Sequence, residues 1–243
     1  MLQELLLSLS GYPSPLFDLV DSVHTVEKAA DASSATRHST ATLLTTTERA
    51  LLAPLARLAS LNARLQTHTT QIASSHPSIV CRAVASAIYT GSLAQFQQHV
   101  IDTERALLRR DAAFVANGAS VPLTALVGEF APWIRRMEWL WAVLVRGYIL
   151  GLTGQTGDSQ ATAVSGAGLI DLLRAETISG YTDIETLATS LATVAELAWL
   201  KQVSAWALYG RLPSFGTEDF FVRPVDDDGV RKHFHLAVHE HED

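Results

Sequence analysis

Hydrophobic residues recur at helical spacing along most of this 243-residue chain. The first example is the leucine-rich segment from Leu2 to Leu9, whose apolar residues fall three or four positions apart. Gly11 and Pro13 follow it as stop signals. The pattern predicts a short amphipathic helix at the start of the sequence.

Longer segments continue the same pattern. Capping-box spacing at Thr45 and Glu48 predicts a helix start, and it recurs at Thr182 and Glu185. Gly91 is expected to bend or split the second long helix, and Pro132 is expected to kink or divide the third. The predicted helices cover about 45–75, 78–116, 120–148, 169–175 and 182–209, and Gly210 is expected to end the last one.

Polar segments without a period interrupt the helices at residues 28–42 and 153–168, and we interpret both as flexible connections. After Pro213 two short alternating segments, 219–225 and 230–238, flank the sequence DDDG, which favours a hairpin. The predicted fold is all-α: stacked antiparallel helical bundles with a short C-terminal β-hairpin or extended tail. We expect a helical domain at 1–212 and an extended segment at 213–243.

Charge and cysteine content limit the possible partners and location of this chain. The formal net charge is −7, and residues 226–243 hold six acids and two bases, so that a net charge of −4 out of −7 lies in the tail. The basic residues do not gather in a stripe, which argues against a nucleic-acid partner. The lone Cys81 suits a reducing compartment. We also expect no targeting signal and no membrane span, because charged residues interrupt each apolar run.

Motifs for catalysis or cofactor binding are missing: the sequence holds no GxxxxGK, HExxH, CxxC or GxSxG. We therefore predict no catalytic residue, no metal and no cofactor. The histidine pairs His233/His235 and His239/His241 could hold zinc if each pair shared a strand face. An exposed strand running into an acidic tail is the favoured interpretation, since no further ligand completes a site. For Cys81 we favour a buried, inert thiol.

The segment around residues 133–141 alternates aromatic and basic side chains. Such a mixture can stack on nucleic-acid bases, but at helical spacing it more often combines core aromatics with solvated arginines. The two tryptophans outside the main apolar stripe imply a central buried helix or contact with another chain. The candidate interface residues are Trp133, Arg135, Arg136 and Trp139.

Two segments carry a family resemblance. The opening MLQELLLSLSGYP, with Leu5, Leu6, Gly11, Tyr12 and Pro13, and the later KQVSAWALYGRL followed by EDFFVRPV resemble the N-terminal Grip domain of gamma-tubulin complex components. The later motif has family residues at Lys201, Gln202, Ser204, Trp206, Gly210, Leu212, Glu218, Phe220 and Phe221. The chain departs from the family at 213–216, where an acidic turn is usual, in the divergent stretch 16–42, and in the apparent insertion 153–168.

The resemblance implies a non-enzymatic scaffold that makes lateral contacts with neighbouring gamma-tubulin complex components. It places gamma-tubulin binding in a C-terminal half beyond this sequence, and the protein in the cytoplasm and cytoskeleton, at a microtubule-organising centre or spindle pole. The motif residues also have structural interpretations: Trp206 as a packing anchor, Gly210 as a helix cap, and Phe220 and Phe221 as docked rings. A helical adaptor that holds a partner helix in a groove is the alternative function, and an enzyme is the weakest.

Overall fold

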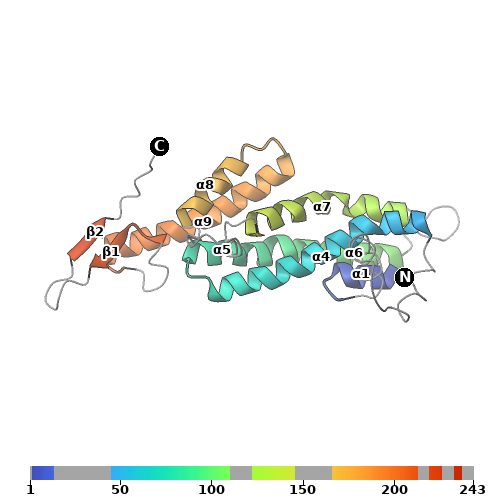
Figure 1. Cartoon of the computed structure of the whole chain (residues 1–243), viewed down its shortest axis with the longest axis horizontal. Helices are drawn as coiled ribbons and strands as arrows, with labels where there is room; N and C mark the ends of the chain where they lie inside the picture. Colours follow the sequence, from blue (N-terminus) through green and yellow to red (C-terminus); the bar gives the residue numbers. More distant parts are fainter. Residues whose placement is uncertain are drawn as a thin grey trace, which may run out of the picture. The chain divides into compact units, whose positions relative to one another are not determined.

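The computed structural model describes residues 2–13, 45–109, 122–145, 166–212, 219–225 and 233–236. Before residue 219 the regular elements in these ranges are helices, so the all-α prediction is confirmed at this level (Figure 1). The helices are α1 (Leu2–Leu9), α4 (Thr46–Ser75), α5 (Ile79–Ala87), the π-helix η1 (Ile88–Leu93), α6 (Ala94–Leu108), α7 (Leu123–Val145), α8 (Gly166–Glu176) and α9 (Thr182–Tyr209). The predicted connection at 28–42 lies outside the described residues.

The chain divides into two compact units. Unit 1 comprises residues 1–67 and 91–141, and unit 2 comprises residues 68–90 and 142–243. The chain thus leaves unit 1 within α4, and returns to it at Gly91, inside η1. Gly91 was expected to bend or split this helix, and the structure has a π-helical turn there, a type of insertion that locally widens an α-helix.

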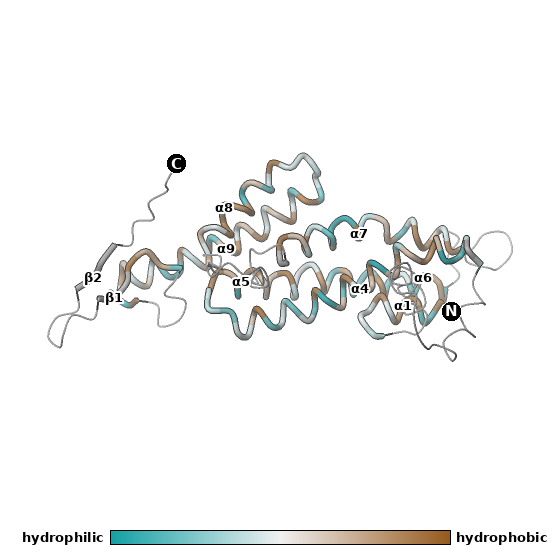
Figure 2. The backbone as a smooth tube through the Cα atoms, in the orientation of Figure 1, coloured by the Kyte–Doolittle hydropathy of each residue, from teal (hydrophilic) through white to brown (hydrophobic). Residues whose placement is uncertain are grey.

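Unit 1 is built on the amphipathic faces of α1, α4, α6 and α7. Along α4, hydrophobic and hydrophilic positions alternate at helical spacing (Figure 2). The predicted capping box at its start is confirmed: the Thr45 N–H donates to Glu48 Oε2 (2.9 Å), and the Glu48 N–H donates to Thr45 Oγ1 (3.2 Å). The fully buried side chains of this unit include Leu5, Leu9, Leu52, Leu55, Leu58, Phe96, Leu126, Phe130 and Met137.

Unit 2 is built on α5, α8 and α9, which pack against one another. Residues 177–181 connect α8 to α9, so the two helices form a helical hairpin (Figure 1). The buried face of α9 contains alanines at 188, 192 and 195, whose small side chains allow close helix packing. The chain then forms β1 (Val222–Val225), which pairs antiparallel with β2 (His233–Leu236). The predicted turn at 226–229 lies outside the described residues.

Two local predictions need correction, and the structure narrows a third. The flexible connection was expected to reach Gly168, but α8 already begins at Gly166. Thr182 was expected to cap α9, but the N-cap is Tyr181, which makes no side-chain cap hydrogen bond. The third helix was expected to kink or divide at Pro132, and α7 runs through this position without dividing.

One described stretch, Ile79–Leu108, has the length and apolar composition of a membrane span. However, 44% of its most apolar window is buried within the protein. The side chains of Val84 and Phe96 are fully buried, whereas Gln95 and Asp102 are exposed. This amphipathic distribution is typical of core helices, with α5 packed in unit 2 and α6 packed in unit 1.

Candidate partner-binding surfaces

The opening motif fixes α1 to unit 1. Leu5 and Leu6 are buried, and Gly11 adopts φ +101°, a conformation that favours glycine. The Gly11 N–H donates to the Ser8 carbonyl and the Tyr12 N–H donates to the Leu7 carbonyl, the pattern of a Schellman motif. Leu5 and Leu6 thus pack α1 into the core of unit 1, and Gly11 ends the helix.

The end of this motif is exposed. Tyr12 is 61% exposed, and Pro13 is also exposed. From α4, Asn62 Nδ2 donates to the Leu9 carbonyl at 2.9 Å, and this buried hydrogen bond ties the end of α1 to α4. Asn62 thereby satisfies one of the carbonyls that a helix end leaves unpaired. The exposed end of the motif is therefore held in place by a buried contact.

The later motif forms an aromatic cluster, defined as Trp206, Phe220 and Phe221. The Trp206 ring centroid lies 5.9 Å from that of Phe220 and 5.5 Å from that of Phe221, both in edge-on geometry. The two phenylalanine centroids are 4.6 Å apart, and Phe220 is only 2% exposed. Gly210 ends α9 with φ +62°, as predicted. The cluster holds the chain that follows α9 against that helix.

Asp219 joins this cluster to the starts of two helices. Its Oδ1 accepts the N–H of Gly166 (2.7 Å), the first residue of α8, and its Oδ2 accepts the N–H of Val80 (3.4 Å) in the first turn of α5. The side chain is 7% exposed. Both contacts place the carboxylate at the positive end of a helix dipole. Sequence reasoning missed this residue, because its partners lie 53 and 139 positions away.

The α7 candidates divide between packed and exposed positions. The Trp133 ring lies 5.2 Å from the Phe96 ring in edge-on geometry, and the Arg136 guanidinium lies 5.3 Å from the Trp133 centroid. Trp139 is half-buried, whereas Arg135 is exposed. The structure therefore places Arg136 against Trp133, and Trp133 against α6.

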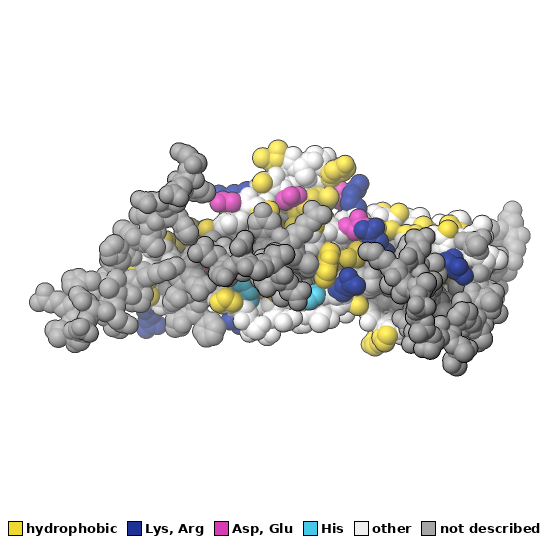
Figure 3. Space-filling view, in the orientation of Figure 1, with side chains coloured by type: hydrophobic (Ala, Val, Ile, Leu, Met, Phe, Trp, Pro, Cys, Tyr) yellow, Lys and Arg dark blue, Asp and Glu magenta, His cyan; other side chains and the backbone are white. Residues whose placement is uncertain are grey.

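Unit 1 has a small groove between α1 and α6, with a volume of about 360 Å³. Leu7 is 52% exposed there and Ile101 is 41% exposed, and Glu4 and Glu104 also line it. In the space-filling view, exposed hydrophobic side chains form several small groups among charged ones (Figure 3). The groove of unit 1 thus combines apolar and acidic character.

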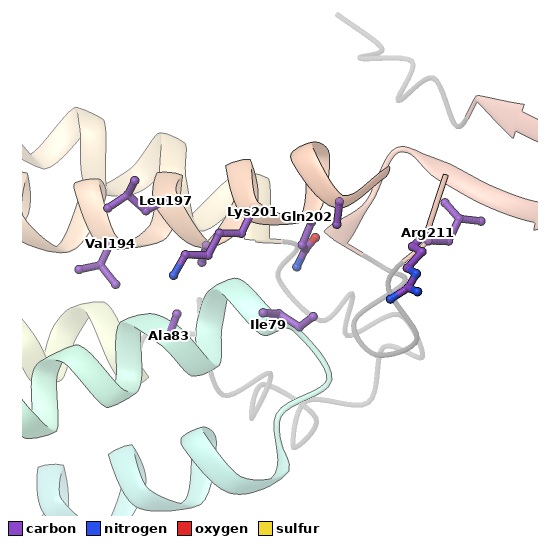
Figure 4. A pocket seen from close by; sticks show the side chains of 10 residues that line it. Ile79, Ala83, Val194, Leu197, Lys201, Gln202 and Arg211 are labelled. Carbon is purple, nitrogen blue, oxygen red and sulfur yellow. The ribbon is translucent and has the colours of Figure 1, made fainter. Parts of the chain in front are cut away.

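Unit 2 has a larger groove of about 630 Å³ between α5 and α9, termed here the α5–α9 groove. Figure 4 shows Val194, Lys201 and Gln202 pointing from α9 towards α5, which presents Ile79 and Ala83. Arg211 and Leu212, just beyond α9, also line it. This groove combines apolar and basic character.

A comparison with protein families decides the class of this chain. Residues 2–240 match the family described as gamma tubulin complex component N-terminal. The chain belongs to this family. A comparison with curated proteins finds no match. The chain is therefore a helical scaffold domain of the gamma-tubulin complex, which nucleates microtubules. Its family implies that its partners are other components of this complex. The family also implies a cytoskeletal, microtubule-organising location.

Family membership also bears on the search for chemistry. The gamma-tubulin complex family is a structural scaffold and not a known enzyme family. The described residues hold no group of three or more His, Cys, Asp or Glu side chains that could bind a metal ion. The side chains of His233 and His235, and the whole of His239 and His241, lie outside what the structure describes. The zinc hypothesis therefore stays untested.

Cys81 is a buried free thiol in the first turn of α5. Burial raises the pKa of this thiol from 9.0 to about 11; a hydrogen bond with Ser78 opposes the shift, and the Asp219 carboxylate adds to it. Since the thiolate is the reactive form, we expect iodoacetamide at neutral pH to label Cys81 in the gamma-tubulin complex chain only after denaturant is added.

The same shift gives a pH dependence. The pKa of the Cys81 thiol is higher in the folded chain than in the unfolded chain, so the protonated thiol contributes fully to folding stability below pH 9.0. This contribution is lost as the pH rises through about 11. The midpoint of urea unfolding should therefore fall across that range more steeply than in Cys81→Ala. Rapid labelling of the native protein at neutral pH would contradict the buried environment.

Proposed function

We propose that this chain forms side-by-side contacts with the N-terminal regions of neighbouring gamma-tubulin complex components, and so helps to assemble the template for microtubule nucleation. The observation that carries the proposal is the family match over residues 2–240. The proposal assigns the chain a purely structural role without catalysis, at microtubule-organising centres including the spindle pole. It assigns no gamma-tubulin contact to these 243 residues.

The proposal includes a finer architecture. We infer that the helices stack antiparallel as bundles over residues 1–212, and that residues 213–243 form a hairpin or extended segment. The packing of α5, α8 and α9 and the antiparallel pairing of β1 with β2 support this inference. Among members of the family, the opening MLQELLLSLSGYP resembles the start of gamma-tubulin complex component 4.

Exposed apolar side chains support a role in association. Leu7 on α1 is 52% exposed, and Leu208 and Tyr209 at the end of α9 are each 74% exposed. The free energy falls when a partner removes exposed apolar side chains from water. Arg135 and Trp139 on α7 remain candidate interface residues under this proposal.

Sedimentation velocity tests the proposal. The chain is mixed with the N-terminal fragment of another gamma-tubulin complex component over a concentration series, and a faster boundary is expected in the mixture than for either fragment alone. Leu7→Asp and Leu208→Asp should weaken the association without unfolding the chain, because both side chains are exposed. Gln95→Asp, exposed on α6, is the control for added charge. Independent sedimentation of every pairing tested would refute the proposal.

The adaptor function remains a second candidate, because the α5–α9 groove offers an apolar surface between two helices. Amphipathic helices commonly dock in grooves of this kind. The polar groups of the groove decide which type of segment fits it.

A further inference from the structure

The α5–α9 groove contains a buried side-chain amide that has no hydrogen-bond partner among the described residues. Gln202 is 7% exposed, and neither its Oε1 nor its Nε2 forms a hydrogen bond with any residue that the structure describes. Figure 4 shows this side chain pointing into the groove towards α5. A buried polar group without a partner is energetically unfavourable. An occupant of the groove that supplies one hydrogen-bond donor and one acceptor would therefore satisfy this amide.

An amide side chain has the same donor and acceptor groups as a backbone peptide unit. An extended segment presents a free N–H and a free C=O at each residue, and these can pair with Gln202 Oε1 and Nε2. An α-helix uses both groups in its own hydrogen bonds. Gln202 therefore favours an extended occupant over a helical one.

The rest of the groove defines the side chains of this occupant. Ile79, Val194 and Leu197 contribute apolar surface, and Leu197 is 52% exposed. Lys201 and Arg211 also line the groove, are exposed, and form no ion pair with another described residue. Aliphatic side chains would cover the apolar surface, and a carboxylate would complement the two cations. A volume of about 630 Å³ is in the range of ligand pockets and suits a short segment.

We propose that the α5–α9 groove binds an extended segment of another gamma-tubulin complex component, with aliphatic side chains and at least one carboxylate. The identity of the partner rests on the proposed function, whereas the chemistry of the segment rests on Gln202, Lys201 and Arg211. This contact is additional to association through the exposed residues of α1 and α9.

Fluorescence anisotropy with overlapping labelled peptides tests the inference. The peptides cover the other gamma-tubulin complex components and, as a comparison set, this chain itself. We expect binding by peptides that combine aliphatic and acidic residues, and loss of binding when their acids are replaced by lysine. Binding only by this chain's own peptides would overturn the assignment to another component, and binding only by peptides that become helical would overturn the extended occupant.

Variants in the groove give the sharper test. Gln202→Leu removes the two unpaired groups, so the free chain should unfold at the same or higher urea concentration, yet peptide affinity should fall roughly tenfold, since the peptide unit loses its partners. Lys201→Glu with Arg211→Glu should weaken binding by a similar factor or more. Arg109→Glu, which changes an exposed cation at the end of α6, is the charge control and should bind normally.

The two proposals can fail separately. If whole fragments sediment together but no peptide binds and Gln202→Leu leaves their association unchanged, the groove inference is overturned while the scaffold proposal stands. If peptides bind as expected but fragments sediment independently, the groove is supported and side-by-side association is refuted.

Discussion

Replacing Asp219 by alanine is expected to lower the free energy of unfolding of unit 2 by about 2–4 kcal/mol, because one side chain caps two helices. The carboxylate accepts from Gly166 at 2.7 Å and from Val80 at 3.4 Å, and it is 7% exposed. Alanine would leave both N–H groups buried without an acceptor. Urea unfolding followed by circular dichroism measures the loss, and hydrogen exchange at these two amides should lose protection first.

Two further variants make this prediction specific. Asp171→Ala removes an exposed acid from α8 and should change stability by less than about 0.5 kcal/mol. Asp219→Asn keeps one carbonyl acceptor and should fall between the two. Equal stability of Asp219→Ala and Asp171→Ala would show that the double cap contributes nothing.

The same contact explains a sequence prediction that was wrong. Glycine-rich composition favoured a flexible connection through Gly168, yet α8 begins at Gly166. A Cβ at Gly166 would lie 2.8 Å from Val80 Cβ and 3.0 Å from Asp219 Cγ, so this glycine permits the close approach of two helices. Composition carries no information on such a contact, since both partners are distant in the sequence.

Two predictions that rest on neighbouring residues in the sequence are confirmed. The capping box at Thr45 and the glycine end of α9 at Gly210 depend on neighbouring residues alone, and both are present in the structure. The same spacing at Thr182 failed because the N-cap of α9 is Tyr181, one residue earlier. A capping motif therefore needs the right register as well as the right residues.

Surface features were the least predictable part. Periodicity placed Gln202 in a helix, and the resemblance marked it as a family residue. Neither indicated that its amide is buried without a hydrogen-bond partner in the described part of the chain. Trp133 was assigned to a possible interface because it lies off the main apolar stripe of α7. Its ring packs near Phe96 of α6, a contact that a single-helix pattern cannot reveal.

Replacing Phe96 by alanine is expected to destabilise unit 1 by about 3–5 kcal/mol, the usual loss for a buried aromatic side chain. Phe96 is fully buried, and its ring lies 6.1 Å from that of Phe130 and 5.2 Å from that of Trp133, both in edge-on geometry. The measurement is urea unfolding of the whole chain. Leu108→Ala, 74% exposed on the same helix, is the matched control and should have little effect.

A double-mutant cycle between Phe96→Ala and Trp133→Ala decides the role of Trp133. If the contact between the rings stabilises unit 1, the two losses should be non-additive by about 0.5–1.5 kcal/mol, and Trp133→Ala should leave association with another component unchanged. If Trp133 acts mainly at an interface, the losses should add and the single variant should sediment as a weaker complex. Their geometry favours the first result, since Trp133 already contacts Phe96 and Arg136 within unit 1.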